Sequence, residues 1–214
     1  MSTDCEQTHV CDVYNLIADE FSDSRNCMWK GTKVFLDAIP SHSIVLDAGC
    51  GNGKNMMYRS DLVMKGIDFC PKFVNICEGR GLDVTQANIL TIPYADDTFD
   101  YVISTAVIHH LDSASRRMNA INECIRVCKP NGKVYITLWA FEQDPTSKHT
   151  FVQGVNYVPW KGRKHLSDPK SRYYYLYDRK EIHQIKDQLE ADEHDVVIEY
   201  ERSNHVLIVT KSHQ

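Results

Sequence analysis

The chain has 214 residues, of which 43% are hydrophobic and 25% are charged, and its formal net charge is −5. This length and composition fit a single globular domain and exclude a collagen, a coiled coil and a disordered chain. No window approaches the ~18 consecutive apolar residues of a membrane span, and the polar N-terminus does not resemble a signal peptide, so we expect a cytoplasmic protein without membrane contact.

Helical stretches and hydrophobic runs alternate along the first two thirds of the chain. Two helices, over residues 10–21 and 32–38, come first and form an N-terminal helical cap over 8–38. Five strand-like runs follow, at 44–47, 63–68, 83–87, 99–104 and 133–139. Helices are predicted between them at 54–59, 71–80 and 113–128. Strands separated by helices at this spacing indicate βαβ units and therefore a parallel sheet.

The last third of the chain has a different pattern. Residues 141–177 are polar and basic, and we interpret them as an insertion on the substrate side of the domain. A helix over 178–189 follows, and then two apolar runs at 196–200 and 206–210. These two runs are too close for a helical crossover and should pair antiparallel. We therefore predict one α/β domain over 1–214, whose mostly parallel seven-stranded sheet ends in an antiparallel hairpin.

The eight cysteines include no CxxC pair. A structural zinc site would need paired cysteines or histidines at set spacings, so we expect no metal site and reduced thiols that pack as small hydrophobic side chains. Charge is concentrated in residues 161–180, which hold seven Lys or Arg and two Asp. Such a basic segment on an acidic body is typical of a contact with an anionic partner such as nucleic acid, although a solvated loop would have the same composition.

The strongest local signal is a glycine loop, IVLDAGCGNGKN, in which an apolar strand ends at Asp47 and glycines follow at 49, 51 and 53. Glycines allow a tight turn and let a ligand lie directly against the backbone. The GxGxG spacing differs from the GxGxxG of dinucleotide folds, which argues against an oxidoreductase, and no P-loop GK[ST] follows. Asp47 would repel a pyrophosphate but suits a ligand with a cationic group.

Two further polar residues follow the next strands. Asp68 ends the second strand, where a carboxylate can accept hydrogen bonds from both hydroxyls of a ribose. Asn88 follows the third strand, at the place where an adenine would lie, and its side-chain oxygen can accept from the exocyclic amine. The loop and these two residues together predict a site for an adenine nucleoside.

The segments VLDAGCGNG, GID, NILTIPYADDTFDYVISTAVIHHL and CKPNGKVYITLW resemble the class I S-adenosylmethionine-dependent methyltransferases. The resemblance implies their Rossmann-like fold and S-adenosylmethionine as the cofactor. The residues it implies for cofactor binding are Asp47, Gly49 and Gly51 around the methionine part, Asp68 at the ribose, Asn88 and Ile89 at the adenine, with Gly53 and Thr105 completing the set.

The flanking segments DVYNLIADEFSDSR, AVIHHLDSASRR, LWAFEQ, YVPWK and RYYYLYDRKEI are similar to the eukaryotic tRNA wobble-uridine methyltransferases. Members of this family esterify the carboxylate of 5-carboxymethyluridine at the first anticodon position. The resemblance therefore implies a tRNA anticodon loop as the substrate. It also implies a heterodimer with a small zinc-binding activator protein, which would pair with the exposed sheet edge at residues 83–87.

A carboxylate nucleophile is already ionised at pH 7, because the pKa of ordinary carboxyls is about 4, and the reaction needs orientation more than a general base. The expected catalytic residues are therefore those that can orient the substrate carboxylate or neighbouring phosphates, namely Tyr14, Arg25, His110, Arg116 and Arg172. An unpaired base also needs a stacking surface. The candidates for that surface are Trp139, Trp160 and the tyrosines at 173–175.

Several of these assignments have alternatives. One of His109 and His110 is expected to be structural while the other faces the site, and Arg116 and Arg117 point about 100° apart on a helix, so at most one serves the pocket. Trp139 and the tyrosine run also suit a hydrophobic core. The competing functions are a methyltransferase acting on a small molecule or lipid, and a non-catalytic cofactor-binding subunit.

Overall fold

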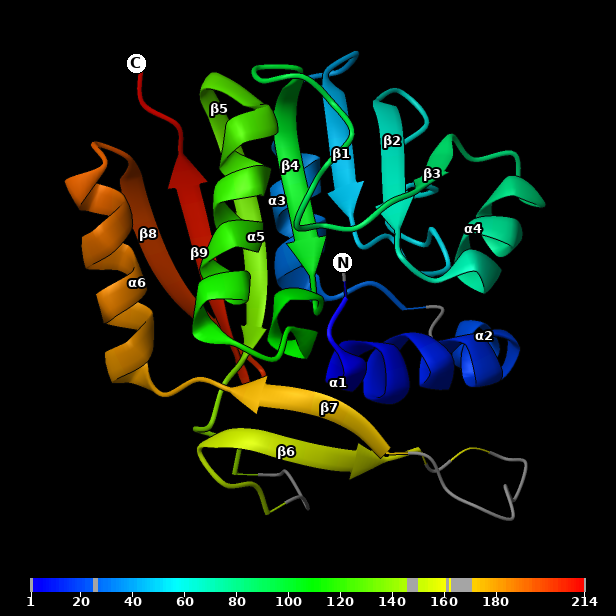
Figure 1. Ribbon diagram of the computed structural model, residues 1–214. Helices are drawn as coiled ribbons and strands as arrows, with labels where there is room; N and C mark the ends of the chain where they lie inside the picture. The colour runs from blue at the N-terminus through cyan, green and yellow to red at the C-terminus, as the bar shows by residue number, and fades with distance from the viewer. Residues whose placement is uncertain (1, 25–26, 146–149, 161, 163–170, 214) are drawn as a thin grey trace.

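A seven-stranded sheet, with strand order β3-β2-β1-β4-β5-β9-β8, forms the centre of the computed structural model (Figure 1). The model describes all residues except 1, 25–26, 146–149, 161, 163–170 and 214. The parallel strands are β1 (Ile44–Ala48), β2 (Val63–Asp68), β3 (Val84–Gln86), β4 (Phe99–Thr105) and β5 (Cys128–Trp139). The antiparallel strands are β8 (Asp195–Glu201) and β9 (Asn204–Thr210). The predicted sheet, including its closing hairpin, is confirmed.

The strand order places a ligand site at one edge of this sheet. The chain runs outward from β1 through β2 to β3, then returns to β4 on the other side of β1. Ligands of open α/β sheets bind outside the carboxyl ends of the strands at such a reversal, because the loops there diverge and leave a crevice. The glycine loop follows β1 directly and therefore lies at this point.

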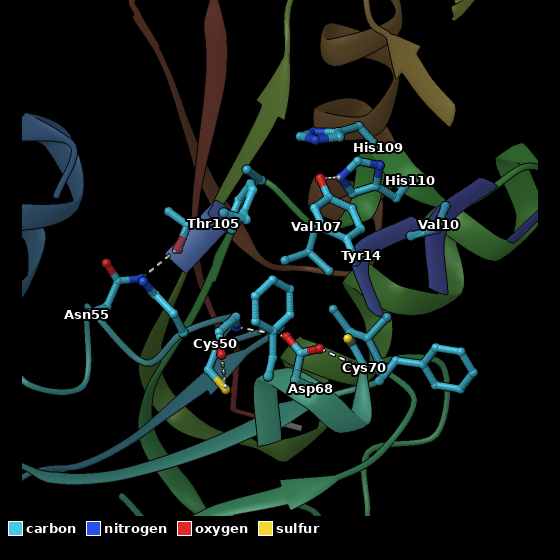
Figure 2. Close-up of a pocket in the computed structure, with 18 of the residues that line it drawn as sticks. Val10, Tyr14, Cys50, Asn55, Asp68, Cys70, Thr105, Val107, His109 and His110 are labelled. Carbon is cyan, nitrogen blue, oxygen red and sulfur yellow. Dashed lines mark hydrogen bonds between the residues drawn. The ribbon is translucent and has the colours of Figure 1, made fainter. Parts of the chain in front are cut away.

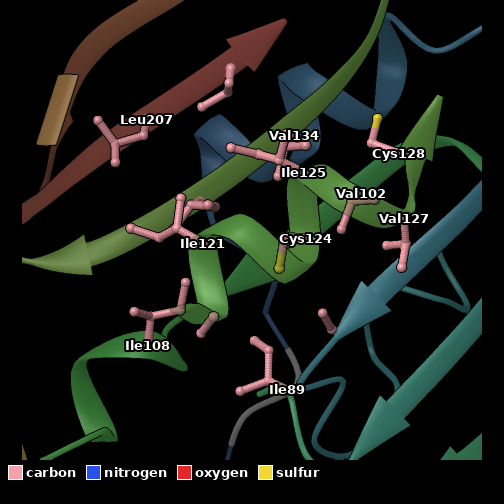
Figure 3. Packing of buried hydrophobic residues seen from close by; sticks show 14 of the residues in the cluster. Ile89, Val102, Ile108, Ile121, Cys124, Ile125, Val127, Cys128, Val134 and Leu207 are labelled. Atoms are coloured by element: carbon pink, nitrogen blue, oxygen red, sulfur yellow. The ribbon is translucent and has the colours of Figure 1, made fainter. Parts of the chain in front are cut away.

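Helices cover both faces of the sheet (Figure 1). On one face lie α5 (Ala114–Val127) and α6 (Arg179–Ala191), and α3 (Lys30–Asp37) lies on the other. The helix α4 (Pro71–Glu78) follows β2, with a proline in its first turn. The main core lies between α5 and the sheet, where Ile121 and Ile125 pack against Val134 and other fully buried side chains (Figure 3).

Side chains at the helix starts explain where α5 and α6 begin. Ser113 precedes α5, and its hydroxyl accepts a hydrogen bond from the backbone N–H of Arg116. Asp178 and Glu181 form a capping box at α6, in which each side chain accepts from the backbone of the other. These bonds satisfy N–H groups that have no partner inside a helix.

The predicted helix over 54–59 is wrong, because this segment forms only turns. Its asparagine side chains make other hydrogen bonds that compete with a helix. The side-chain oxygen of Asn52 accepts from the backbone N–H of Lys54, and the Asn55 amide donates to Asp47 and Thr105. The segment thus fixes the glycine loop to the neighbouring strand β4 instead of continuing as a helix.

The polar segment after β5 contains a small two-stranded antiparallel sheet of β6 (Gly154–Pro159) and β7 (Ser171–Leu176). The tyrosines at 173–175 lie in β7. This sheet and the N-terminal helices α1 (Asp4–Glu6) and α2 (Asp12–Ser24), joined by a π-helical turn (Gln7–Cys11), lie across the carboxyl edge of the main sheet (Figure 1). None of the helices in the described part of the chain is both long and apolar enough to cross a membrane.

Candidate active site

A cavity of about 780 Å³ opens at the carboxyl edge of the sheet, within the usual size range of small-molecule sites. It brings together nine of the predicted site residues: Tyr14, Gly49, Gly51, Asp68, Asn88, Ile89, Thr105, His110 and Arg172. Asp47, Gly53 and Arg116 are not among its lining residues, and Arg25 lies outside the residues that the structure describes.

Asp68 joins the glycine loop to the start of α4 (Figure 2). One carboxylate oxygen accepts from the backbone N–H of Gly51 and the other from that of Cys70, both at 2.8 Å. Burial raises the pKa of Asp68 to about 6, although these two hydrogen bonds act in the opposite direction. Each oxygen keeps a second lone pair. The ionised side chain can therefore still accept hydrogen bonds from two hydroxyls of a ligand.

Asp47 lies beneath the glycine loop and is completely buried. One of its oxygens accepts from the Asn55 amide at 3.3 Å, and the other has no hydrogen-bond partner among the residues that the structure describes. Burial raises the pKa of Asp47 to about 7, and the charge of Asp68 adds to this. A cationic ligand beside the loop would stabilise the ionised form, because a buried carboxylate without a counter-charge is unfavourable.

The three glycines differ in what they contact, although all have positive φ angles of 85°, 53° and 74° at positions 49, 51 and 53. A Cβ atom at Gly51 would meet no atom within 4 Å, so its backbone borders open space in the cavity. A Cβ atom at Gly49 would lie 2.3 Å from Val107, and one at Gly53 would lie 2.3 Å from Leu82. Gly53 therefore packs the loop against the segment before β3.

Asn88 and Ile89 line the cavity beyond Asp68. The Asn88 side-chain oxygen accepts from the backbone N–H of Leu90 at 2.9 Å, which fixes its orientation and leaves one lone pair for a ligand amine. Ile89 offers an apolar surface beside it. Exposed loop backbone, two carboxylates and this apolar wall fit S-adenosylmethionine, which has a sulfonium, a ribose and an adenine.

Arg172 lies on β7, is only 7% exposed and lines the same cavity. Its guanidinium lies 5.2 Å from the ring centres of both Trp160 and Tyr174. Within the described part of the chain it makes no hydrogen bond and no ion pair, and its Nε atom is buried without a partner. A buried, unpaired cation is unfavourable, so this position suits an anion that enters the cavity.

His110 and Tyr14 form a neutral hydrogen-bonded pair (Figure 2). The Nδ1 atom of His110 lies 2.7 Å from the carbonyl oxygen of Tyr173, so it must carry the proton and donate. Its Nε2 atom then accepts from the Tyr14 hydroxyl at 3.1 Å. Burial lowers the pKa of His110 to about 4. The Tyr14 hydroxyl therefore donates its proton to His110, whereas the sequence predicted that this hydroxyl would orient the substrate.

His109 belongs to an aromatic wall of the cavity. It stacks on Trp139 and Tyr174, whose own ring centres are 4.2 Å apart, and its Nδ1 atom accepts from the Trp139 backbone N–H at 3.3 Å. Burial holds its pKa well below the usual value of a histidine. Both histidines therefore line the cavity and both are neutral, whereas the sequence suggested that one of them would be purely structural.

Neither of the adjacent arginines on α5 lines the cavity. Arg116 donates to both carboxylate oxygens of Glu6, at 2.7 and 2.5 Å, and so connects α5 to α1. Arg117 is buried, donates to the carbonyl oxygen of Leu111 at 3.0 Å and lies 3.5 Å from the ring centre of Tyr175. Both side chains hold elements of the fold together.

The cavity also has lining residues that sequence reasoning missed, namely Trp29, Lys30, Arg202 and Asn204. No local motif marks them, because they meet only where the start of α3 approaches the turn between β8 and β9. The structure shows no group of three or more His, Cys, Asp or Glu side chains that could hold a metal ion among the residues it describes.

The chain is similar to known methyltransferases in sequence and in fold. A family profile for the methyltransferase domain matches residues 46–136. The tRNA (carboxymethyluridine(34)-5-O)-methyltransferase of Schizosaccharomyces pombe is 31% identical over 204 residues, which cover 86% of this chain and 89% of that protein. The Arabidopsis thaliana protein of the same name is 42% identical over 142 residues, 66% of this chain. The chain covers only 35% of that Arabidopsis relative.

Solved structures with the same fold are more distant in sequence. A methyltransferase in complex with the Trm112 methyltransferase activator, from Haloferax volcanii, is 16% identical and has a TM-score of 0.67. The match covers 96% of this chain and 98% of that one. The cyclase SpnF has a TM-score of 0.69 at 15% identity, and the match covers 100% of this chain and 98% of that one. At these identities the likeness shows the fold alone.

Proposed function

We propose, from the premise that this chain belongs to the family of tRNA (carboxymethyluridine(34)-5-O)-methyltransferases, that it transfers a methyl group from S-adenosylmethionine to the carboxylate of 5-carboxymethyluridine at the wobble position of tRNA. The product is the methyl ester. The observation that supports this substrate most directly is the buried guanidinium of Arg172, which has no polar partner among the described residues and belongs to a side chain that lines the same cavity as the glycine loop.

The cofactor supplies a methyl group on a positively charged sulfur. In the proposed arrangement Asp68 accepts hydrogen bonds from the ribose hydroxyls, and Asn88 and Ile89 contact the adenine. Gly49 and Gly51 border the methionine part, and the buried Asp47 stabilises its positive charge from beneath the loop. Thr105 holds Asn55 through a hydrogen bond of 3.0 Å and thereby supports the loop.

The substrate carboxylate needs orientation and no general base. Arg172 would pair with it from β7 and hold one oxygen in line with the methyl group. The neutral histidines also matter, because an imidazolium would be a second cationic donor to the carboxylate beside Arg172 and would reduce its nucleophilicity further. The wall of His109, Trp139 and Tyr174 offers an aromatic surface beside which an unpaired uracil can stack.

We also propose that the protein works as a heterodimer with a small zinc-binding activator. Strand β3 is an outer strand of the sheet, and Thr85 and Gln86 are exposed there, so another chain can add a strand at this edge. The archaeal methyltransferase with the same fold was solved with an activator bound. Residues 1–214 would act as one domain, in which the 8–38 cap and the 141–177 insertion close the cavity.

A reducing, cytoplasmic location is consistent with this proposal, because all eight cysteines are free thiols and four of them line the cavity. Disulfide formation there would distort the cofactor site, and cytoplasmic thiols are kept reduced.

The test is methyl transfer from labelled S-adenosylmethionine to bulk tRNA that carries unesterified carboxymethyluridine. The protein is assayed alone and after co-production with its candidate activator, and the labelled nucleoside is identified by mass spectrometry. Label in the methyl ester of carboxymethyluridine supports enzyme, substrate and acceptor atom together. A complex that binds the cofactor but labels no tRNA would instead indicate a small-molecule acceptor.

A further inference from the structure

We call the part of the cavity lined by Trp29 and Lys30, at the start of α3, and by Arg202 and Asn204, at the β8–β9 turn, its second branch. The proposed function assigns no role to these four residues. Asn204 pairs directly with Trp139 across β9 and β5. The branch therefore lies beside the aromatic wall.

The turn that presents Arg202 has an unusual backbone. Arg202 and Ser203 are its two central residues, with φ angles of 43° and 66°. Two-residue hairpin turns with positive φ strongly prefer Asn and Gly at these positions, because a Cβ atom is unfavourable there. The backbone oxygen of Ser203 accepts from Ala140, and its hydroxyl accepts from the Asp144 backbone, at 2.9 and 2.8 Å. These contacts hold the turn, and with it Arg202, at the cavity.

The polar and aromatic groups of this branch are available for a ligand. Lys30 and Arg202 make no ion pair or hydrogen bond through their side chains with any residue in the described ranges. The neighbouring acid, Glu201, is engaged, since both of its oxygens accept from the backbone N–H of Gly31, at 3.0 and 2.9 Å. The indole of Trp29 makes no ring contact with another described aromatic side chain.

Asn204 adds an unsatisfied acceptor at the wall of the branch. It is 5% exposed, and its amide nitrogen donates to the carbonyl oxygens of Glu201 and Arg202 at 3.3 and 2.9 Å. This contact identifies which end of the amide is the oxygen, and that oxygen has no donor among the described residues. Because this oxygen is also shielded from solvent, the role of Asn204 is to hold the turn at the cavity through its amide nitrogen.

We propose that this second branch binds the nucleotide next to the wobble uridine in the anticodon loop. The inference rests on the proposed function, which requires a single-stranded loop whose target base enters the cavity. Trp29 stacks on the neighbouring base, while Lys30 and Arg202 contact the phosphates on either side of it. Proteins hold single-stranded nucleic acid with such a combination of an aromatic ring and neighbouring cations.

The test is binding of two anticodon stem-loop RNAs, one with uridine and one with 5-carboxymethyluridine at the wobble position, measured by fluorescence anisotropy over a range of salt concentrations. The variants are W29A, K30Q and R202N. The control is K133Q, since Lys133 is exposed and lies outside the cavity, toward the start of β5.

Loss of either cation should weaken the binding of both RNAs by the same factor and reduce the slope of log affinity against log salt by about 0.7, the value for one phosphate contact with a single strand. W29A should weaken binding about tenfold with an unchanged slope, because stacking involves no counterion. Equal losses for the two RNAs place the contact at a neighbouring nucleotide. K133Q should bind like the wild type.

Two measurements exclude other roles for the cations. Asn tolerates positive φ, so R202N should keep the wild-type unfolding temperature, and both cation variants should keep wild-type affinity for S-adenosylmethionine in calorimetry. If K30Q or R202N loses cofactor affinity, the branch holds the cofactor and the inference is wrong.

If all three variants bind both RNAs like the wild type, the inference is also wrong, while the proposed function still stands on methyl transfer by the wild type. If the wild type binds RNA but transfers no methyl group to carboxymethyluridine, the proposed function fails instead.

Discussion

The two halves of the cavity are built in opposite ways. On the cofactor side, residues 47–68 form one continuous stretch from the end of β1 to the end of β2, and their polar groups hydrogen-bond to one another, as when Asp68 accepts from Gly51. On the substrate side, α2, β7 and the β8–β9 turn come from distant parts of the chain. There, Arg172, Lys30 and Arg202 have no polar partner within the described residues. Hydrogen bonds hold the first half together, with one oxygen of Asp47 left without a partner, whereas the cations of the second half have no polar partner among the described residues.

The largest effect should come from breaking the cofactor side. Asp68→Ala removes two charge-assisted hydrogen bonds to the loop, each contributing about 1.5–3 kcal/mol, together with the acceptors for the ribose. We expect binding of S-adenosylmethionine to become undetectable in calorimetry. The control is Asp83→Ala, which removes an exposed carboxylate paired with Lys65 and should leave cofactor affinity unchanged.

On the substrate side, Arg172→Gln should separate binding from transfer. We expect cofactor affinity to remain, whereas methyl transfer to tRNA should fall about a hundredfold, because a buried charge pair with the carboxylate is lost. Without ligand, the variant should unfold about 2–4 °C higher for each kcal/mol gained by removing an unpaired buried charge.

Arg117 is the matched control for this prediction, since it is equally buried but hydrogen-bonded to Leu111 and stacked on Tyr175. Arg117→Gln should lower the unfolding temperature. If both arginine variants were destabilised alike, the distinction between an arginine with a guanidinium hydrogen bond and one without would be refuted.

The pH dependence of cofactor binding tests the cofactor side of the cavity. Burial raises the pKa of Asp47 to about 7, so its ionised form, which favours a cationic cofactor, increases as pH rises through neutrality. We expect affinity for S-adenosylmethionine to increase about tenfold from pH 5.5 to pH 7.5. Calorimetry on Asp47→Asn should show weaker binding and only the smaller rise that comes from ionisation of Asp68, whose pKa is about 6.

The stability of the ligand-free protein changes with pH in the opposite direction. A carboxyl whose pKa is higher in the folded than in the unfolded state makes the folded protein bind more protons between about pH 4 and pH 7, so this group lowers stability as pH rises through that window. Asp47→Asn should therefore raise the unfolding temperature at pH 7.5 more than at pH 5. An equal change at both values would contradict a raised pKa at Asp47.

The smallest effect concerns backbone strain on the substrate side. Arg202→Gly should stabilise the protein by about 1 kcal/mol in chemical denaturation, because its φ of 43° is unfavourable for a residue with a Cβ atom. Ser203→Gly should act in the same direction. A loss of stability in both variants would show that the turn holds no strain.

The same division explains how much the sequence predicts. Strand β2 matches its predicted range, and the glycine loop, Asp68 and Asn88 lie around one cavity, because short-range patterns specify this half. Arg116 and Arg172 look equally available in the sequence. Only the fold shows that Glu6, close to the N-terminus, pairs with the first, whereas the second has no acidic partner among the described residues. No local sequence pattern marks Trp29 or Arg202 either, because these residues come together only in the folded chain.

The small sheet of β6 and β7 should open locally while the main sheet stays folded. Isolated two-stranded sheets are marginally stable in water, so this one depends on the N-terminal segment, through the hydrogen bond of 3.2 Å between the His9 ring and the Ser171 carbonyl oxygen and through Tyr14 and His110. These contacts join residues more than ninety positions apart, which favours late formation during folding. In hydrogen exchange, residues 4–24 and β7 should lose protection together as one cooperative unit while the central strands stay protected. The half of the cavity that receives RNA would then open and close while the half that holds the cofactor stays folded.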